Sequence, residues 1–228
     1  MPVRILFAVL RLAVAVAIAA AIIAQLAASL AFWRDRGVGN IGSNVVNFFS
    51  FFTVESNIAA AVVLAVGAVL LIVRPGPDSV AFALTRASVV SYMVVTGVVY
   101  NLLLRGIELP QGSTVAWSNE VLHAIAPLYL LVDWLFAPGR SPIAARRIWV
   151  VLLFPLVWTA YTLVRGPFVD DQVYGNAFWY PYPFLNPFTS ANGYLSVSFY
   201  VVLIAAVIGI VAAGALWISR RPSARLTR

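Results

Sequence analysis

Residues 47–73 read NFFSFFTVESNIAAAVVLAVGAVLLIV. From Ile58 onward the stretch carries no charged or strongly polar side chain, and about 20 mostly apolar residues let a helix cross a hydrocarbon core roughly 30 Å thick. Its start contains a hydroxyl (Thr53), a carboxylate (Glu55) and an amide (Asn57). Polar groups are costly in lipid, so we expect them to serve a function or to contact a neighbouring helix. We expect their partner to be the single histidine, His123.

The composition agrees with a membrane-embedded chain. Hydrophobic residues make up 62% of the 228 residues, charged residues only 10%, and the mean hydropathy is +0.94. Soluble domains contain roughly 45–50% apolar residues. The absence of cysteine and the presence of one histidine argue against thiolate catalysis and against a metal centre, so we expect neither a metal nor a cofactor.

Six stretches are long and apolar enough to span a bilayer, which predicts an all-α fold forming one domain over residues 1–228. The first stretch resembles a signal peptide, but its apolar part of about 20 residues exceeds the usual 7–15. We therefore interpret it as a span. The expected spans cover about 5–33, 45–73, 80–104, 119–137, 145–164 and 194–218.

The distribution of arginine predicts the orientation. The net charge of +7 comes from arginines at the ends of apolar runs, where they orient a membrane protein, and we do not expect a nucleic-acid partner. If the N-terminus is cytoplasmic, eleven arginines lie inside and four outside, which predicts cytoplasmic termini in a multi-pass protein of the cell membrane. The inner set is Arg4, Arg11, Arg74, Arg86, Arg140, Arg146, Arg147, Arg220, Arg221, Arg225 and Arg228; the outer set is Arg34, Arg36, Arg105 and Arg165.

The second expected span presents polar groups on one face. Thr53, Ser56 and Asn57 stand at i, i+3 and i+4, whereas Glu55 points elsewhere. A hydroxyl beside an amide suits a nucleophile beside an oxyanion donor. The alternative is helix packing, because Thr and Ser bond to their own helix carbonyls and Asn bonds to a neighbour. From the residues alone, packing is the favoured interpretation of Thr53.

His123 lies near the start of the fourth expected span, on the same side of the bilayer as Thr53. Histidine titrates near neutrality and suits a general base or a proton relay. Glu120, three residues earlier, is placed to orient its imidazole. The alternative is an amphipathic ring resting at the interface without a catalytic task. The residues alone do not decide between these interpretations.

Two further features bear on function. Arg86 and Asp133 lie near the inner ends of their spans, and we expect them to form a structural ion pair because either charge alone would be expensive. Only Tyr129 lies between Asp133 and His123 as an ionisable group, which argues against a proton or ion pathway. The aromatic segment 178–184 is expected to cover the outer mouth of the bundle, either as a lid or as an aromatic belt.

Three motifs together resemble the androgen-induced gene 1 protein family. They are FFTVESN at 51–57, EVLHAIAP at 120–127 and WYPYPFL at 179–185. The family includes the androgen-dependent tissue-factor-pathway-inhibitor-regulating protein and six-span bacterial relatives, and the resemblance covers nearly the whole chain in the number and order of spans.

The resemblance implies an intramembrane hydrolase that cleaves acylated lipids of the fatty acid ester of hydroxy fatty acid type. By position, Thr53 is then the nucleophile and His123 the base, with Asn57 or Asn101 as the candidate oxyanion donor. Membrane lipid and a lipid ester are the expected partners. The alternatives are a non-enzymatic lipid-binding or transport protein, in which the same residues shape a polar cavity, and a structural subunit. The oligomeric state stays open.

Overall fold

The computed structural model describes residues 2–109 and 111–221, and their regular elements are all helices. Arg225 and Arg228, which entered the charge count, lie outside the described residues. Several of the helices are long and apolar enough to cross a bilayer, so the chain is a multi-pass membrane protein. These helices cover Pro2–Asp35 (α1), Phe52–Val73 (α3), Val80–Leu104, Ala145–Phe168 and Tyr194–Ser219 (α8).

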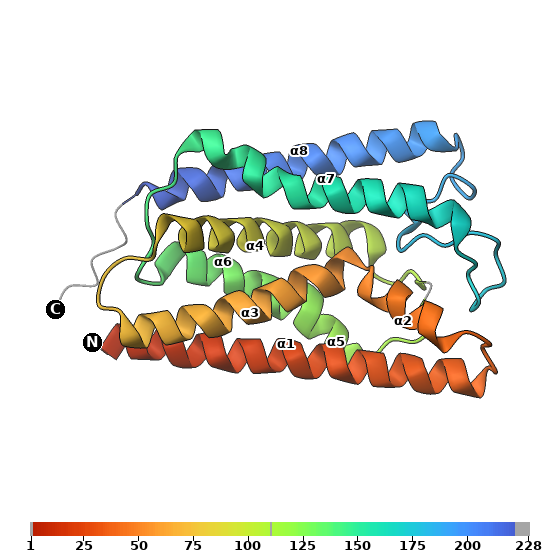
Figure 1. Ribbon diagram of the computed structural model, residues 1–228, viewed down its shortest axis with the longest axis horizontal. Coiled ribbons are helices and arrows are strands. Elements are labelled where there is room, and N and C mark those ends of the chain that lie inside the picture. The colour runs from red at the N-terminus through yellow and green to blue at the C-terminus, as the bar shows by residue number, and fades with distance from the viewer. Residues whose placement is uncertain (1, 110, 222–228) are drawn as a thin grey trace.

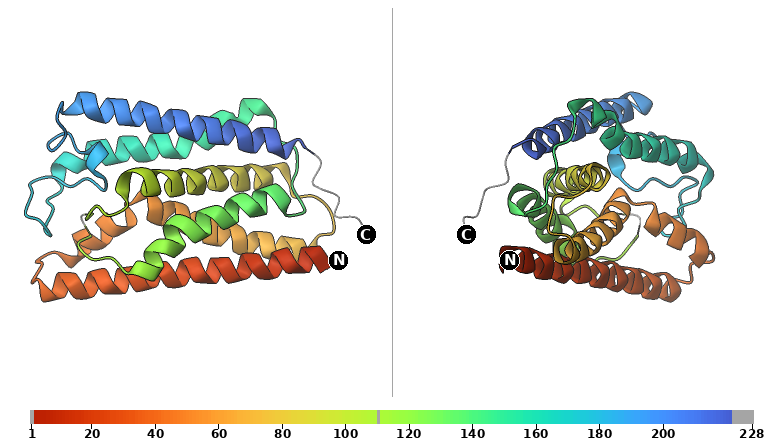
Figure 2. Two further views of the ribbon diagram at one scale, coloured as in Figure 1. Left: turned by 180° about the vertical axis from the view of Figure 1, so that it is seen from behind. Right: turned by 60° about the vertical axis from the view of Figure 1, so that its left-hand side comes forward.

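Helix α4 (Val80–Val99) occupies the centre of the bundle (Figures 1 and 2). On one side of it lie α1 and α3, and on the other lie α7 (Ile148–Arg165) and α8. Helix α6 (Ala126–Phe136) packs against α4 as well. Most of α4 is buried, in keeping with its many small residues such as Ala83, Ala87 and Ser91, which let neighbouring helices approach closely. Helix α1 begins and α8 ends at the same end of the bundle.

The expectation of one continuous helix over 45–73 is wrong. The chain forms α2 (Ile41–Phe49), breaks at Ser50 and Phe51, and starts again as α3. Phe51 is extended, with φ −70° and ψ 128°. A break inside the protein requires other partners for the backbone. The indole Nε1 of Trp158 supplies one by donating to the Ser50 carbonyl at 3.1 Å.

The fourth expected span, 119–137, is assembled from three consecutive segments and is not among the long helices above. They are α5 (Ala116–Glu120), the π-helical segment η2 (Val121–Ile125) and α6. Pro127 follows the π segment and has no N–H to donate to the carbonyl four residues earlier. A second π segment, η1 (Tyr100–Leu104), ends the helix that starts with α4. π segments of this length often occur at functional sites.

The connection between α7 and α8 folds over the end of the bundle opposite the start of α1 (Figure 1). Trp179, Tyr180 and Tyr182 are buried in it, and the Tyr182 ring contacts Phe51 at 5.6 Å between centroids. These rings are therefore part of the protein core. The interpretation of this segment as a cap agrees with the structure, whereas a lipid-facing belt would leave the rings exposed.

A buried charge network joins three helices near the other end. Asp133 lies 2.9 Å from Arg86, so the expected ion pair is present. Arg11 is buried as well and binds Asp133 at 2.8 Å, a pairing that the sequence does not predict. Arg86 also pairs with Asp78. The positive charges of the two arginines are therefore neutralised by the carboxylates of Asp78 and Asp133, because buried charges are stable only when paired.

Candidate functional site

Thr53 lies in the first turn of α3 as a result of the helix break. Backbone N–H groups in the first turn have no partner within their own helix. The phenol of Tyr182 meets this need by accepting from the Thr53 N–H at 3.2 Å, and its oxygen lies 3.3 Å from Thr53 Oγ1. The hydroxyl proposed as a nucleophile is thus placed at a helix N-terminus, beside a tyrosine from the cap.

Asn57 is fully buried one turn deeper, on the same face of α3. Its amide nitrogen donates to the carbonyls of Thr53 (2.9 Å) and Leu122 (3.2 Å), and so uses both of its hydrogens. The second bond ties α3 to the π segment that carries His123. Asn57 therefore positions α3 and η2 relative to one another, and its side-chain amide has no N–H left for a substrate oxygen.

His123 projects from η2 and stacks on Tyr100 of η1, with ring centroids 3.8 Å apart and an interplanar angle of 24°. Its Nδ1 lies 3.0 Å from the backbone carbonyl of Asn119. A carbonyl only accepts, so Nδ1 carries the proton and Nε2 keeps the lone pair that a general base needs. Asn119 also donates to the Tyr100 hydroxyl, which holds the stacking partner in place.

Asn101 lies beside the backbone of His123. Its amide nitrogen donates to the Gly97 carbonyl at 2.8 Å and to the His123 carbonyl at 3.1 Å. The His123 carbonyl is available because Pro127 cannot donate to it. Asn101 thereby stabilises the π segment, and like Asn57 it has both amide hydrogens engaged.

Glu120 does not contact the imidazole in the way the sequence had led us to expect. Its carboxylate forms a bidentate pair with Arg105, at 2.7 and 3.1 Å. Arg105 extends from the end of η1 and also binds Asn101. The Asn119 carbonyl orients the imidazole instead, because a planar guanidinium on the facing segment offers a carboxylate a better-matched partner. The pair raises the pKa of Arg105 through the hydrogen bond to Glu120.

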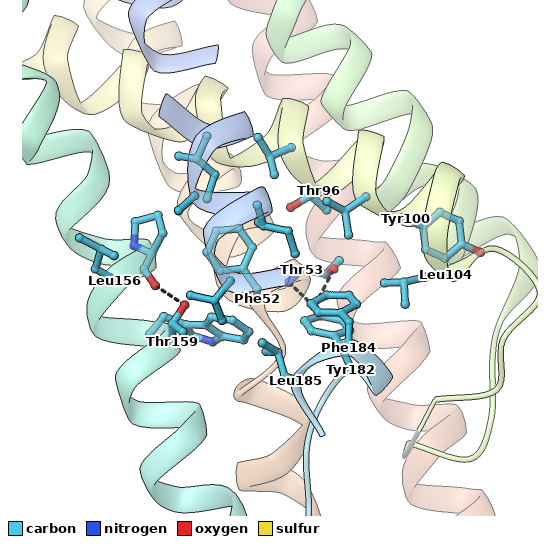
Figure 3. A pocket seen from close by; sticks show the side chains of 18 of the residues that line it. Phe52, Thr53, Thr96, Tyr100, Leu104, Leu156, Thr159, Tyr182, Phe184 and Leu185 are labelled. Carbon is cyan, nitrogen blue, oxygen red and sulfur yellow. Dashed lines mark hydrogen bonds between the residues drawn. The ribbon is translucent and has the colours of Figure 1, made fainter. Parts of the chain in front are cut away.

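Two cavities meet at Thr53 and Tyr182, which line both of them. The first has a volume of about 130 Å³ and is walled mainly by apolar side chains of α4, α7, α8 and the cap. Figure 3 shows Thr53 and Tyr182 together at this cavity, with the hydrogen bonds between them. The first cavity suits an apolar chain.

The second cavity has a volume of about 50 Å³ and contains the polar part of the site. Thr53 and His123 both line it, together with Gln25, Ser118 and Asn119. Within the part of the chain that the structure describes, no hydrogen bond joins Thr53 to His123, because each bonds to another partner. The two predicted catalytic residues therefore share a cavity without being in direct contact.

A third cavity, of about 160 Å³, lies within the cap and is lined by Glu108, Asp171 and several aromatic side chains. Tyr182 lines it as well, and so borders all three cavities. Among residues 2–109 and 111–221 there is no group of three or more His, Asp or Glu side chains close enough to hold a metal ion.

Compared with models of protein families, with curated proteins and with solved structures, the chain matches none of them. These comparisons therefore assign no chemistry to the site.

Sequence reasoning missed the groups that complete the site: Tyr182, Tyr100 and Asn119. Tyr182 lies 129 positions from Thr53, and nothing in the local pattern of either residue marks the pair. Tyr100 is one of nine tyrosines and becomes notable only when η1 and η2 face each other. Two signals were available: the aromatic motif at 179–185 contains Tyr182 without indicating its partner, and Pro127, which has no N–H, marks an irregularity in the helix that carries His123.

Proposed function

We propose that the chain is an intramembrane hydrolase of acylated lipids in which Thr53 is the nucleophile and His123 the general base. One observation carries the proposal: Thr53 lines both an apolar cavity and a second cavity that it shares with His123 and several other polar side chains. An ester carbonyl at Thr53 would then have its acyl chain in the apolar cavity and its alcohol oxygen toward the imidazole.

The steps follow from the groups present. Thr53 Oγ1 attacks the ester carbonyl carbon while His123 Nε2 takes the hydroxyl proton. The tetrahedral intermediate expels the alcohol, which receives that proton, and leaves an acyl-threonine. Water then attacks the acyl group, with His123 again accepting a proton, and the free acid is released. A hydroxyl needs a base within hydrogen-bond reach to react near neutral pH, so Thr53 and His123, which share a cavity without touching in the free protein, would have to come into contact when the substrate binds.

The resemblance to the androgen-induced gene 1 protein family supports the same assignment and suggests a fatty acid ester of a hydroxy fatty acid as the substrate. It also supports a topology of six spans, with the segment 116–136 as the fourth and both termini in the cytoplasm. In that topology, the cap and the mouth of the site face the outside of the cell membrane.

The test combines covalent labelling with turnover. A fluorophosphonate probe should label Thr53 in the wild type, and Thr53→Ala should abolish both labelling and ester hydrolysis. His123→Gln should lower kcat by about 10²–10⁴-fold, the usual contribution of general base catalysis. Thr159→Ala is the matched control, since Thr159 lines the apolar cavity and bonds only to the carbonyl of Pro155 in its own helix. Full hydrolysis by Thr53→Ala would refute the proposal.

A second candidate function is lipid binding without turnover. It is favoured by the hydrogen bond that occupies the Thr53 hydroxyl, whose partner is Tyr182 and not a base. In this case the purified protein retains an ester lipid unchanged, and His123→Ala alters retention of that lipid while no ester is consumed.

A further inference from the structure

Hydrolysis at Thr53 requires a hydrogen-bond donor for the oxyanion that develops on the ester carbonyl. Removing one such donor typically costs an acyl-transfer enzyme about 10²–10³ in kcat. Neither amide predicted for this task is available. Asn57 and Asn101 each donate both amide hydrogens to two backbone carbonyls.

Tyr182 can supply the hydrogen that the amides lack, because its hydroxyl faces the hydroxyl of Thr53, with which it can exchange the roles of donor and acceptor. Its oxygen accepts from the Thr53 N–H at 3.2 Å, which uses an oxygen lone pair and leaves the phenolic hydrogen available. That oxygen lies 3.3 Å from Thr53 Oγ1, the atom proposed to attack. A group this close to the nucleophile is within reach of a carbonyl oxygen bonded to the attacked carbon.

We propose that Tyr182 is a catalytic residue that donates its phenolic hydrogen bond to the oxyanion formed by attack of Thr53. The inference rests on the proposed function and adds the donor that it requires. In the free protein, the phenol is bonded to Thr53. As the C–O bond to Thr53 forms, the phenolic hydrogen turns to the carbonyl oxygen, and it returns to Thr53 when the intermediate collapses and the C=O bond is restored.

The packing of Tyr182 keeps its hydroxyl in place. The ring is 5% exposed, stacks on Phe184 at 5.2 Å and meets Phe51 edge-on at 5.6 Å. Burial raises the pKa of Tyr182 to about 12, so the phenol is protonated throughout the neutral range and acts as a donor. Packing fixes the phenolic oxygen, so only its hydrogen has to turn during the reaction, and donors whose heavy atoms are held in place stabilise developing charge strongly.

Tyr182 also borders both cavities that the proposed substrate would occupy. The carbonyl of a bound ester lies where the apolar chain ends and the polar part begins. The Thr53–Tyr182 pair occupies that junction, since both residues line the apolar and the polar cavity. An oxyanion donor is needed at this position and at no other point along the substrate.

Tyr182→Phe tests the proposal, because it removes the hydroxyl and preserves the ring packing. We expect kcat for ester hydrolysis to fall about 10²–10³-fold with little change in KM. Labelling of Thr53 by a fluorophosphonate should slow by a similar factor, because the probe also develops charge on an oxygen. Tyr180→Phe is the control: Tyr180 is a buried neighbour that lines the cavity within the cap, and its variant should hydrolyse at the wild-type rate.

A second measurement separates this role from a structural one. A trifluoromethyl ketone forms a tetrahedral adduct with the nucleophile, whereas the corresponding ether is an uncharged substrate mimic. Tyr182→Phe should weaken inhibition by the ketone about 10²-fold and leave binding of the ether unchanged. Equal losses for both compounds would show that Tyr182 only shapes the cavity.

The outcomes distinguish the two proposals. If the wild type is labelled on Thr53 and Tyr182→Phe is labelled and turns over equally fast, only the role of Tyr182 is refuted. If Thr53 is not labelled in the wild type and no ester is consumed, the hydrolase and this role are refuted together.

Incorporation of 3-fluorotyrosine at position 182 keeps the hydroxyl and the packing. Activity should persist at neutral pH and be lost on the alkaline side at lower pH than in the wild type.

Discussion

Single residues in this site have different tasks that their chemical type alone does not reveal. Thr53, Asn57 and Asn101 all carry groups suited to acyl transfer. In the structure, only Thr53 presents its group to two cavities, whereas both asparagines use their amides to hold backbone carbonyls. The number of free N–H groups decides between these tasks. An amide that already donates both of its hydrogens cannot donate a further hydrogen bond to a transition state.

This distinction leads to a prediction for Asn57. Asn57→Ala leaves the carbonyls of Thr53 and Leu122 without their buried donor, and it should destabilise the protein by about 1–3 kcal/mol. Activity should fall through misplacement of His123, and a thermal unfolding assay in detergent should show the loss of stability directly.

Ser56→Ala is the matched control for Asn57→Ala. Ser56 is equally buried on the same face of α3 but bonds to Thr53 O and to the hydroxyl of Thr96. It makes no bond to η2, so its loss should leave kcat close to that of the wild type. A stable Asn57→Ala protein with unchanged kcat would contradict the positioning role.

At the scale of elements, irregular helices position the site. The break before α3 brings Thr53 to a helix N-terminus, and the π segments η1 and η2 bring Tyr100 against His123. The break and η2 each leave backbone groups that a regular helix would satisfy, and side chains compensate for them: Trp158 and Tyr182 at the break, and Asn101 at η2. Broken helices at membrane depth are tolerated only with such compensation.

Gly97 tests the contact between the two π-containing helices. A Cβ at this position would lie 3.0 Å from Pro127 Cβ and 3.3 Å from the His123 carbonyl oxygen. Gly97→Ala should therefore push the helices apart, cost about 1–3 kcal/mol of stability as overpacking does, and lower kcat. Thermal unfolding and turnover measure the two effects.

Gly209→Ala and Gly214→Ala serve as controls for the glycine substitution. Both lie within α8, and an added Cβ meets no atom within 4 Å at either position. Alanine favours a helix by about 1 kcal/mol over glycine, so these variants should be as stable as the wild type or slightly more stable. A Gly97→Ala protein that behaves like them would contradict close packing at this site.

At the scale of the whole molecule, the charge network and the site lie apart in the bundle and serve different purposes. Asp133 binds Arg11 of α1 and Arg86 of α4, and so connects three helices through one carboxylate. A carbonyl of α3, that of Gly67, accepts from Arg11 as well. Removal of one partner from a buried ion pair is strongly destabilising because it leaves the other charge uncompensated.

Asp133→Asn should accordingly destabilise the protein by about 3–5 kcal/mol, seen as a large loss of thermal stability in detergent. The variant leaves the buried guanidinium of Arg11 without a carboxylate and leaves Arg86 with Asp78 as its one carboxylate among the described residues. Glu120→Gln provides the comparison, since the Arg105–Glu120 pair is exposed to solvent and should contribute little to stability. Equal effects of the two substitutions would show that the network has no special structural importance.

The sequence by itself determined the class of the protein. The length and hydropathy of the apolar stretches identified a helical multi-pass membrane protein. The cost of polar groups in lipid drew attention to Thr53, Glu55, Asn57, His123, Arg86 and Asp133 without ranking the first three, and only the family resemblance selected Thr53 among them. The pairing of Arg86 with Asp133 also followed, because unpaired buried charges are so unfavourable that few partners qualify.

Only the tertiary structure decided how these residues are arranged. The break at Ser50 and Phe51 depends on Trp158 and Tyr182, which are distant in sequence, so no local propensity could reveal it. For the same reason, the observed partner of Glu120 is Arg105 and not the predicted His123. Arg105 reaches Glu120 only because η1 and η2 face each other. Contacts between distant segments outweigh local spacing wherever backbone and charge must be satisfied inside the bilayer.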